Sequence, residues 1–507
     1  MEATAELPPA ALKRQRGLVT VSIMLATIMQ ALDTTIANVA LPSMQGSLSA
    51  TSEQISWVLT SYIVAAAITI PMTGFLAARL GRKRLFLLSV AGFTIASVLC
   101  GLATNLTELV AFRLLQGIFG AGLVPLSQAV LLDTYPKEQH GSAMAMWGVG
   151  VMVGPILGPT LGGYLTDAFN WRWVFFINVP FGILSLLGIL AFVPETERVQ
   201  RRFDLFGFAL LAIAIGALQL LLDRGQSQDW LASREILLES VIAITTLAMF
   251  LVHMATAREP FLEPGLFRDR NLSIGLLFIF IVGIILLATL ALLPPFLQGL
   301  MGYPVVTTGL VLAPRGIGSM FAMMMVGRLV NRVDIRLLIF IGLSLTAISL
   351  FEMSGFNTNV PVHTLVTTGI TQGLGLGFIF VPLSTISFAT LAPRYRTEAT
   401  AMFSLMRNIG SSIGISIMVT LVARNTQINH ATLGELLNPF RPAFDALSLP
   451  GGIPTDSDTG RALLNQMLTR QAATIAYLDD FRLMAWITVA SMPLLALLRS
   501  DRGPRAR

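Results

Sequence analysis

Charged residues and cysteines are scarce in this chain of 507 residues. Asp, Glu, Lys and Arg make up only 12%, against 54% hydrophobic residues, which is too little polar surface to cover a water-soluble globule of this size. The single cysteine, Cys100, lies inside an apolar run, which excludes an intrachain disulfide, a cysteine-based zinc site and an iron–sulfur cluster. A nucleotide-binding Gly-rich lysine motif is absent, and the four histidines lack metal-ligand spacing. The histidines are His140, His253, His363 and His430. We therefore expect neither an enzyme nor a metal site, cofactor or nucleic-acid partner.

Long apolar runs fill most of the chain instead. A membrane-spanning helix needs roughly 20 mostly apolar residues, and about fourteen such runs are separated by short polar connections. The sequence therefore predicts an all-α polytopic membrane protein. The expected spans are 18–42, 55–78, 85–104, 108–132, 142–165, 174–193, 204–222, 236–256, 272–298, 305–327, 335–354, 363–390, 398–423 and 482–498.

Lys and Arg fall in alternate connections between these runs. If the N-terminus is cytoplasmic, the inner segments collect most of them, and the first several outer loops hold almost none. The positive-inside rule then places both termini in the cytoplasm and requires an even number of spans. The run after the N-terminal tail is too long for a cleaved signal, so we interpret it as the first span. The inner basic residues are Lys13, Arg14, Arg16, Arg79, Arg82, Lys83, Arg84, Arg198, Arg201, Arg202, Arg258, Arg268, Arg270, Arg328, Arg332, Arg336, Arg394 and Arg396.

The chain repeats itself weakly at an offset of eight spans. Duplicated bundles with the substrate site at their interface are common in transporters. The matching residues are Gly74, Leu76 and Arg79 with Gly327, Leu329 and Arg332; Gln116–Gly117 with Gln372–Gly373; and Gly150 and Gly154 with Gly410 and Gly414. We predict two six-helix bundles with two inserted spans. The segments are an N-terminal tail 1–17, a first bundle 18–203, inserted spans 204–257, a second bundle 258–498 and a C-terminal tail 499–507.

One connection, residues 424–481, is much longer than the others and rich in proline and glycine between Pro439 and Pro454. We expect an outer loop with a short helix near 460–476. Long loops of this kind are often functional, although a solvent-exposed tether is an equal alternative.

Charged side chains inside the apolar runs are candidate functional residues, because charge within hydrocarbon is costly. Asp33 lies about nine residues from the outer end of the first span, roughly 13 Å deep, and Arg113 lies about five residues, or roughly 7 Å, into the fourth. We expect the two to meet. A carboxylate there can alternate between an ionised, arginine-paired form and a protonated form, which would couple a proton to a rocking motion. The alternative is a static ion pair that only fixes helix register.

The fifth span carries a stripe of glycines and two Gly-Pro pairs. Glycines four residues apart permit close helix contact, and the prolines add bends. Generic packing would explain the glycines alone, whereas the Gly-Pro pairs favour a specialised hinge or seal. The residues of this candidate hinge are Gly150, Gly154, Pro155, Gly158, Pro159, Gly162 and Gly163.

A short basic loop from Gly74 to Arg84 follows the second span. It gives an orientation signal, and we expect it to act also as a cytoplasmic gate between helix ends. The gate residues are Gly74, Arg79, Gly81, Arg82 and Lys83.

Two arginines in the second bundle, Arg315 and Arg407, lie near mid-depth without an acid beside them in their spans. They either satisfy themselves on backbone carbonyls and water, or make this half of a cavity electropositive and unfavourable for strongly cationic cargo. Gln116 and Gln372 complete the candidate cavity residues.

Together these residues resemble the major facilitator superfamily, and within it the fourteen-span drug:proton antiporters of the EmrB/QacA type, over nearly the whole chain. The first-span acid of that family is associated with proton coupling, and the glycine-rich fifth span is similar to its antiporter motif, the feature most specific to export. The matching stretches are Leu32 to Pro42, Gly74 to Arg84, Arg113 with Gln116–Gly117, Gly150 to Gly163, Trp171 to Pro180, and Arg407 to Gly410.

The resemblance implies the major facilitator fold and a proton-coupled efflux antiporter that exports lipophilic small molecules across the bacterial inner membrane by alternating access. Its energy source would be the proton-motive force. Relatives in double-membraned bacteria often work with a periplasmic membrane-fusion adaptor and an outer-membrane channel, which loop 424–481 would contact. Two departures are Ala78, where the basic loop commonly carries an acid, and the tenth span, which lacks the acid associated with divalent cations in some relatives.

Two other functions stay open on the sequence. The same fold supports a proton-coupled uptake symporter, against which the glycine–proline stripe weighs. A membrane sensor that binds ligands without moving them would give Asp33 and Arg113 no purpose, and the sequence contains no recognisable signalling domain.

Overall fold

The computed structural model describes residues 9–199, 202–436 and 457–499, and these form a bundle of α-helices. Within them, thirteen helices are long and apolar enough to cross a membrane, or up to fourteen if one bent pair counts as a single span. The all-α polytopic fold predicted from the sequence is thereby confirmed. The outermost parts of both expected tails, 1–8 and 500–507, and the middle of the expected outer loop, 437–456, lie outside the described residues.

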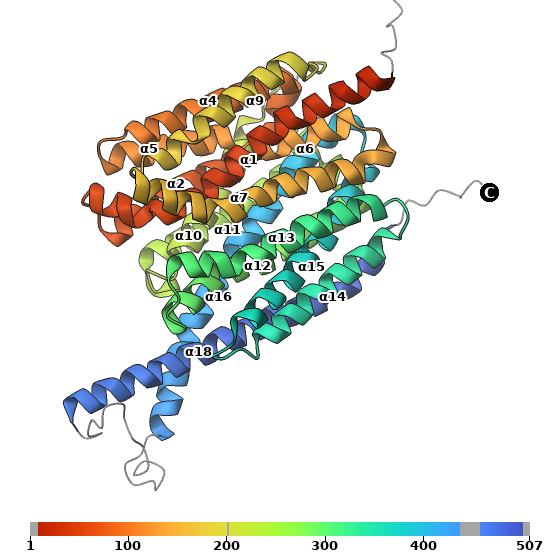
Figure 1. Ribbon diagram of the computed structural model, residues 1–507. Coiled ribbons are helices and arrows are strands. Elements are labelled where there is room, and N and C mark those ends of the chain that lie inside the picture. The colour runs from red at the N-terminus through yellow and green to blue at the C-terminus, as the bar shows by residue number, and fades with distance from the viewer. Residues whose placement is uncertain (1–8, 200–201, 437–456, 500–507) are drawn as a thin grey trace, which may run out of the picture.

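The helices run roughly side by side between two opposite faces (Figure 1). The first face carries the start of α1 (Pro9–Ser47) and the end of α18 (Asp458–Ser491), and we call it the termini face. Beyond the second face, α16 (Arg396–Leu436) projects together with the first part of α18, and we call it the hairpin face. Helix α1 starts at Pro9, so much of the expected N-terminal tail is already helical.

The helices before residue 200 form a group that we call the N half. Besides α1 they are α2 (Ser52–Thr69), α3 (Met72–Leu80), α4 (Arg82–Leu102), α5 (Leu106–Gly120), α6 (Leu123–Thr134), α7 (His140–Ala168), α8 (Trp173–Phe176) and α9 (Asn178–Phe192). Helix α1 packs against α7 and α9, and α5 packs against α2 and α4. Capping residues set several starts, as where the Asn105 side chain accepts the amide of Glu108 at the beginning of α5.

The second expected span is broken into α2 and α3, which meet at an angle of 58°. Pro71 stands at the break, where it cannot donate a backbone hydrogen bond and its ring crowds the preceding turn. The two pieces have different neighbours, because α2 packs against α5 while α3 packs against α16. The stretch from Gly74 to Arg84, expected as a loop, is helical on both sides of Gly81. That expectation was wrong because the basic residues lie at helix ends.

Helices α10 (Leu205–Arg224) and α11 (Arg234–Thr256) pack on each other, and α10 also contacts α2 and α16. Asp204 caps α10 by accepting the amide of Gly207, and it also accepts the amide of Phe261 and pairs with His253. Burial by itself raises the pKa of Asp204, but these hydrogen bonds outweigh it and lower the pKa below its usual range. The domain boundaries at 203 and 257 stay a prediction.

The helices after residue 268 form the C half. Together with α16 and α18 they are α12 (Arg270–Pro295), α13 (Val305–Leu329), α14 (Ile335–Met353) and α15 (Val362–Ala389). Helices α13 and α14 pack on α15, and α12 packs on α16. Pro294 and Pro295 end α12 and lead into a π-helical turn, Phe296–Leu300. Short 3-10 turns along the whole chain are Lys137–Gln139, Trp230–Ala232, Pro264–Arg268, Pro393–Tyr395 and Met492–Leu497.

The long connection expected as an outer loop is mostly a pair of helices. Helix α16 continues to Leu436 and α18 begins at Asp458, so residues 424–436 and 458–481 are helical where a loop was expected, and the short helix expected near 460–476 is part of α18. The start of the last membrane span at 482 stays a prediction. The two extensions are held together where His430 bonds Asn465 and where Asn429 donates to the carbonyl of Ala472. Polar sequence ends the membrane-embedded part of a helix without ending the helix itself.

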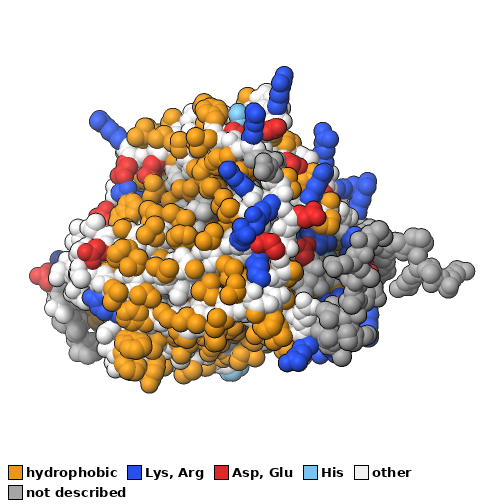
Figure 2. All heavy atoms as spheres, turned by 90° about the horizontal axis from the view of Figure 1, so that it is seen from above, with side chains coloured by type: hydrophobic (Ala, Val, Ile, Leu, Met, Phe, Trp, Pro, Cys, Tyr) orange, Lys and Arg blue, Asp and Glu red, His pale blue; other side chains and the backbone are white. Residues whose placement is uncertain are grey.

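Hydrophobic side chains cover much of one face of the molecule (Figure 2). Many large apolar residues are exposed along the outer sides of the helices, as on α11, where Leu238 and Val252 are 60% and 64% exposed. A soluble protein rarely leaves so wide an apolar surface open, whereas lipid tails cover such a surface without cost.

Candidate functional site

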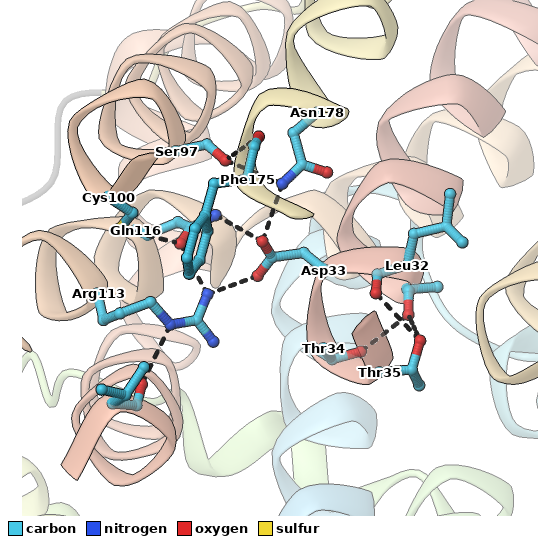
Figure 3. A network of polar contacts seen from close by, with 12 residues as sticks. Leu32, Asp33, Thr34, Thr35, Ser97, Cys100, Arg113, Gln116, Phe175 and Asn178 are labelled. Carbon is cyan, nitrogen blue, oxygen red and sulfur yellow. Dashed lines mark hydrogen bonds and ion pairs between the residues drawn. The ribbon is translucent and has the colours of Figure 1, made fainter. Parts of the chain in front are cut away.

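Asp33 lies at the centre of a fully buried cluster of polar side chains in the N half (Figure 3). Its Oδ2 accepts a hydrogen bond from Arg113 Nη1 at 2.7 Å, in an ion pair whose side chains are 0% and 1% exposed. Its Oδ1 accepts from Gln116 Nε2 at 2.8 Å and from Asn178 Nδ2 at 2.9 Å. The expected meeting of Asp33 and Arg113 is therefore confirmed, while its role in proton coupling is a separate matter.

Four helices besides α1 supply and orient these partners. Arg113 and Gln116 stand one turn apart on α5 and bond each other at 2.7 Å. The guanidinium also donates to the carbonyl of Val58 and lies 4.3 Å from the ring centre of Tyr62, both on α2. Asn178 begins α9 and bonds Ser97 on α4. The carboxylate thus connects α1 to the packed interior of the whole N half.

The glycine stripe of α7 packs against α1, the helix that carries Asp33. A side chain at Gly150 would overlap Met24, one at Gly154 would overlap the backbone of Ala31, and one at Gly158 would overlap Thr35. Thr35 donates a hydrogen bond to the carbonyl of Gly154 at 3.0 Å, so the two helices are joined by a polar contact as well. Glycine is required at Gly154, where the backbone of α1 leaves no room for a Cβ, whereas at Gly150 the Met24 side chain could move aside.

Not every residue of the candidate hinge has this role. Gly162 faces Ile36 of α1, but Gly163 has open space where its side chain would be. Pro155 and Pro159 both lie within α7, which continues as one helix through them. Another face of α7 meets α13 of the C half, where Gly148 lies against Met323 and Ser142 donates to the carbonyl of Gly327. The α7 helix therefore contacts both the Asp33 helix and the other half of the molecule.

The two halves are joined at the termini face by a shared carboxylate. Asp133, at the end of α6, pairs with Arg82 of the N half and with Arg396 of the C half, the latter at 2.6 Å. Arg82 Nε also donates to Thr397 at 2.7 Å, and Thr400 donates to the carbonyl of Pro125 at 3.0 Å. These contacts cross between the halves, so the molecule is closed at this face.

The other expected gate residues contribute differently. Gly74 lets α3 approach the backbone of Glu398 on α16, since a Cβ there would lie 3.0 Å from the Glu398 Cα. Gly81 adopts φ +87°, which lets the chain turn between α3 and α4 beside the Glu195 carboxylate. Arg79 is exposed and Lys83 is half-buried, and no ion pair joins either of them to another described residue.

In the C half, Arg315 and Gln372 lie together while Arg407 lies apart. Arg315, only 6% exposed, lines a cavity of about 20 Å³ with Gln372, Thr346 and Thr488. Its Nη2 makes a long 3.4 Å bond to the carbonyl of Leu286, and its Nη1 has no partner within the part of the chain that the structure describes. Arg407 does not line this cavity. Gln116, expected as a cavity residue, is instead held in the Asp33 cluster.

The comparison with known proteins identifies the family. The model of the Major Facilitator Superfamily matches residues 23–415. The chain belongs to the major facilitator superfamily. It is 37% identical to multidrug export protein EmrB of Escherichia coli K12 over 493 residues, which is 96% of each chain. It is 35% identical to fatty acid resistance protein FarB of Neisseria gonorrhoeae over 486 residues, or 95% of this chain and 96% of that protein.

A solved structure supports the fold of this major facilitator. The proton:xylose symporter XylE matches 96% of this chain and all of its own, at a TM-score of 0.59 and 15% sequence identity, which shows a shared architecture alone. The matches to EmrB and FarB over nearly the whole chain confirm the predicted resemblance to EmrB-type transporters. The protein is a multi-pass membrane transporter and not an enzyme, and major facilitators in general need no cofactor.

Several partners in this major facilitator were missed from the sequence. Asn178 and Ser97 are neutral residues in apolar runs, so a search for charge passes over them. Asp133 stands just past the end of the fourth expected span and resembles an ordinary loop acid. Asp133 places a carboxylate beside Arg82 of the basic segment, where Ala78 provides none. A polar residue inside an apolar run, whatever its charge, is the signal that would have found the first two.

Proposed function

We propose that this protein exports lipophilic small molecules from the cytoplasm across the bacterial inner membrane in exchange for protons. The buried Asp33 cluster is the observation that carries the proposal, because a carboxylate with a single arginine counter-charge inside hydrocarbon is costly to keep without a purpose. Relatives named for multidrug export and for fatty acid resistance support lipophilic small molecules as the cargo. The proton-motive force would be the energy source.

The hydrogen bonds of Asp33 describe how a proton would act. An ionised carboxylate is an acceptor only, and here its two oxygens accept from Arg113, Gln116 and Asn178. A protonated carboxyl carries an O–H donor, which would face another donor and remove at least one of these bonds. It would also leave Arg113 without a counter-charge. Protonation would therefore loosen α1 from α5 or α9, and deprotonation would draw them together.

The packing of α7 offers a path from Asp33 to the other half. Helix α1 carries Asp33 and lies against the glycine stripe of α7, and α7 lies against α13. Since the α1–α7 contact is too close to deform gradually, a shift of α1 would move α7 with it. We infer that the stripe acts as a seal that transmits this movement, rather than as a flexible hinge.

The basic termini face is assigned to the cytoplasm under the positive-inside rule, with both termini inside. The contacts of Asp133 with Arg82 and Arg396 would then keep the cytoplasmic side closed, in a conformation that faces outward. In an exchange cycle this is the conformation that releases cargo and takes up a proton. Breaking the three-residue contact would accompany the return to the inward-facing form.

The projecting pair of α16 and α18 is proposed as the contact for a periplasmic adaptor that leads to an outer-membrane channel. With the termini face inside, this pair would stand in the periplasm. Shortening both helices by whole turns is expected to abolish copurification of an adaptor from native membranes while leaving efflux in vesicles intact. Unchanged copurification would remove the adaptor role.

Sealed proteoliposomes test the exchange mechanism directly. With an imposed proton gradient, the native chain is expected to drive efflux of a lipophilic dye. Asp33→Asn is expected to lose gradient-driven efflux while staying folded, with a lower thermal unfolding temperature because Arg113 loses its counter-charge. Asp229→Asn, at a connection on the hairpin face, is the matched control and should transport normally. Full gradient-driven activity of Asp33→Asn would overturn the proposed coupling.

A further inference from the structure

The cavity beside Arg315 is lined by Gln372, the C-half counterpart of Gln116 in the Asp33 cluster. Thr289 follows Asp33 by the same number of residues as Gln372 follows Gln116. Gln116 contacts Asp33, and Gln372 contacts Thr289. Gln372 Nε2 donates to the Thr289 hydroxyl at 3.4 Å, as Gln116 Nε2 donates to Asp33. The internal repeat therefore places a threonine where the N half has its carboxylate.

The positive charge is kept in the C half but comes from another helix. The alignment of α2 with α13 that matches Gly74 to Gly327 also matches Tyr62 to Arg315. The alignment of α5 with α15 that matches Gln116 to Gln372 also matches Arg113 to Gly369. In the N half the guanidinium of Arg113 lies over the Tyr62 ring. In the C half an arginine replaces the tyrosine, and a glycine stands where the arginine would be. Both positions therefore carry a cation, and only the position in the N half has a carboxylate paired with it.

Arg315 consequently lacks a counter-charge. It forms no ion pair with an acid of the described residues, and its Nη1 and the Gln372 Oε1 have no hydrogen-bond partner there. Glu352 is held by Thr368, one turn along α15 toward the hairpin face. An unpaired guanidinium in an apolar interior is unfavourable unless something else compensates the charge.

The cavity has the size of a small anionic group. Its volume of about 20 Å³ exceeds the roughly 10–15 Å³ needed to hold one water, and is suited to one halide or one carboxylate head. Thr346 and Thr488 line it, but their hydroxyls already donate to the carbonyls of Gly342 and Met484, so the Nη1 group of Arg315 is the donor left for an anion among the lining residues. Val282, Ile285 and Leu376 supply an apolar wall.

We propose that the Arg315 cavity binds a small monovalent anionic group that takes the place of the missing carboxylate. The group is either a free halide or the carboxylate head of an exported lipophilic acid. A cavity of about 20 Å³ holds the head alone, so the chain of such an acid would have to extend beyond it. Only the second source rests on the proposed export function. Binding itself requires no transport, so it can be measured even if the exchange mechanism is wrong.

Ligand-dependent thermal unfolding of the purified full-length protein tests the site. The probes are sodium decanoate against neutral decanamide, and sodium chloride against sodium gluconate at equal ionic strength. A saturable rise in Tm with decanoate or with chloride is expected in the native chain and in Arg461→Gln, an exposed control. In Arg315→Gln the affinity should fall by at least about tenfold, since losing a buried charge contact costs more than about 1.4 kcal/mol.

Thr289→Asp separates an anion site from a merely structural arginine. An aspartate there restores the carboxylate of the N half, so this variant should be more stable than the native chain without added anion and should no longer respond to either probe. Thr289→Asn, of similar size and uncharged, should keep the response. A response to decanoate alone identifies a cargo carboxylate, and a response to chloride identifies a free anion. Equal responses of the native chain and Arg315→Gln to every probe would overturn the proposal.

Discussion

The two halves of the molecule treat a buried arginine in different ways. In the N half, Arg113 is paired with Asp33 and fixed by Gln116, Val58 and the Tyr62 ring, so every charge has a partner. In the C half, Arg315 has a single long backbone bond and lies beside a cavity. A common helical framework therefore carries a complete ion pair in the N half and an arginine without a counter-charge in the C half. Under the two proposals above, the first would bind a proton and the second an anion.

The largest expected effect comes from making the same substitution in each half. Arg113→Gln would leave Asp33 as an unpaired buried charge, and should lower the free energy of unfolding by about 3–5 kcal/mol. Arg315→Gln removes a cation that has no counter-charge, and should leave stability unchanged or raise it. Thermal unfolding of both variants in detergent measures the difference. Equal losses would mean that Arg315 has a partner as strong as Asp33.

A second comparison lies within the glycine stripe. Gly154→Leu forces a side chain into the backbone of Ala31 and should cost about 1–3 kcal/mol or more, together with most gradient-driven efflux. Gly163→Leu, on the same helix with open space at its Cβ, should change stability by less than about 0.5 kcal/mol. Tm and dye efflux measured side by side check this. If Gly163→Leu is as damaging, close packing on α1 is not what selects glycine.

The contact between the halves can be tested at Asp133. Asp133→Asn removes the carboxylate that pairs with both Arg82 and Arg396, and should favour opening of the termini face by about 1.4 kcal/mol, which is tenfold in population. The readout is alkylation of Thr400→Cys, a buried position at this contact, in a Cys100→Ser background. Glu197→Gln, an exposed acid near the same face, is the control. Unchanged labelling would show that apolar packing alone holds this face closed.

The smallest effect is expected at the inserted helices, whose capping acid serves structure and not coupling. Asp204→Ala should cost about 1 kcal/mol of stability and leave efflux unchanged. Because the pKa of Asp204 is lowered in the folded protein, its contribution is fully present above the usual aspartate range and is lost as the pH falls through the lowered value. The Tm difference between the native chain and Asp204→Ala should accordingly be no smaller at pH 5 than at pH 7. A difference that shrinks between those values would contradict this direction.

Length and hydrophobicity were sufficient to predict the helical membrane architecture and the meeting of Asp33 with Arg113, because two opposite charges at similar depth have few other partners in hydrocarbon. Length and hydrophobicity were insufficient where contacts between helices, rather than contact with lipid or water, determine the local structure. Residues 424–436 are polar yet helical, and the stretch from Gly74 to Arg84, expected as a basic loop, belongs to two helices that meet at Gly81. Asn178 and Asp133 gained their roles from helices distant in sequence, which no local pattern records.

The length of α16 has a mechanical consequence. One unbroken helix of 41 residues joins Arg396, at the contact between the halves, to Leu436 beyond the hairpin face. At 1.5 Å per residue it is roughly 60 Å long, about twice the thickness of the hydrocarbon layer, so a tilt of roughly 10° about its inner end would swing its far end by roughly 10 Å. A small tilt of α16 at the contact between the halves would therefore produce a large displacement of its far end outside the membrane.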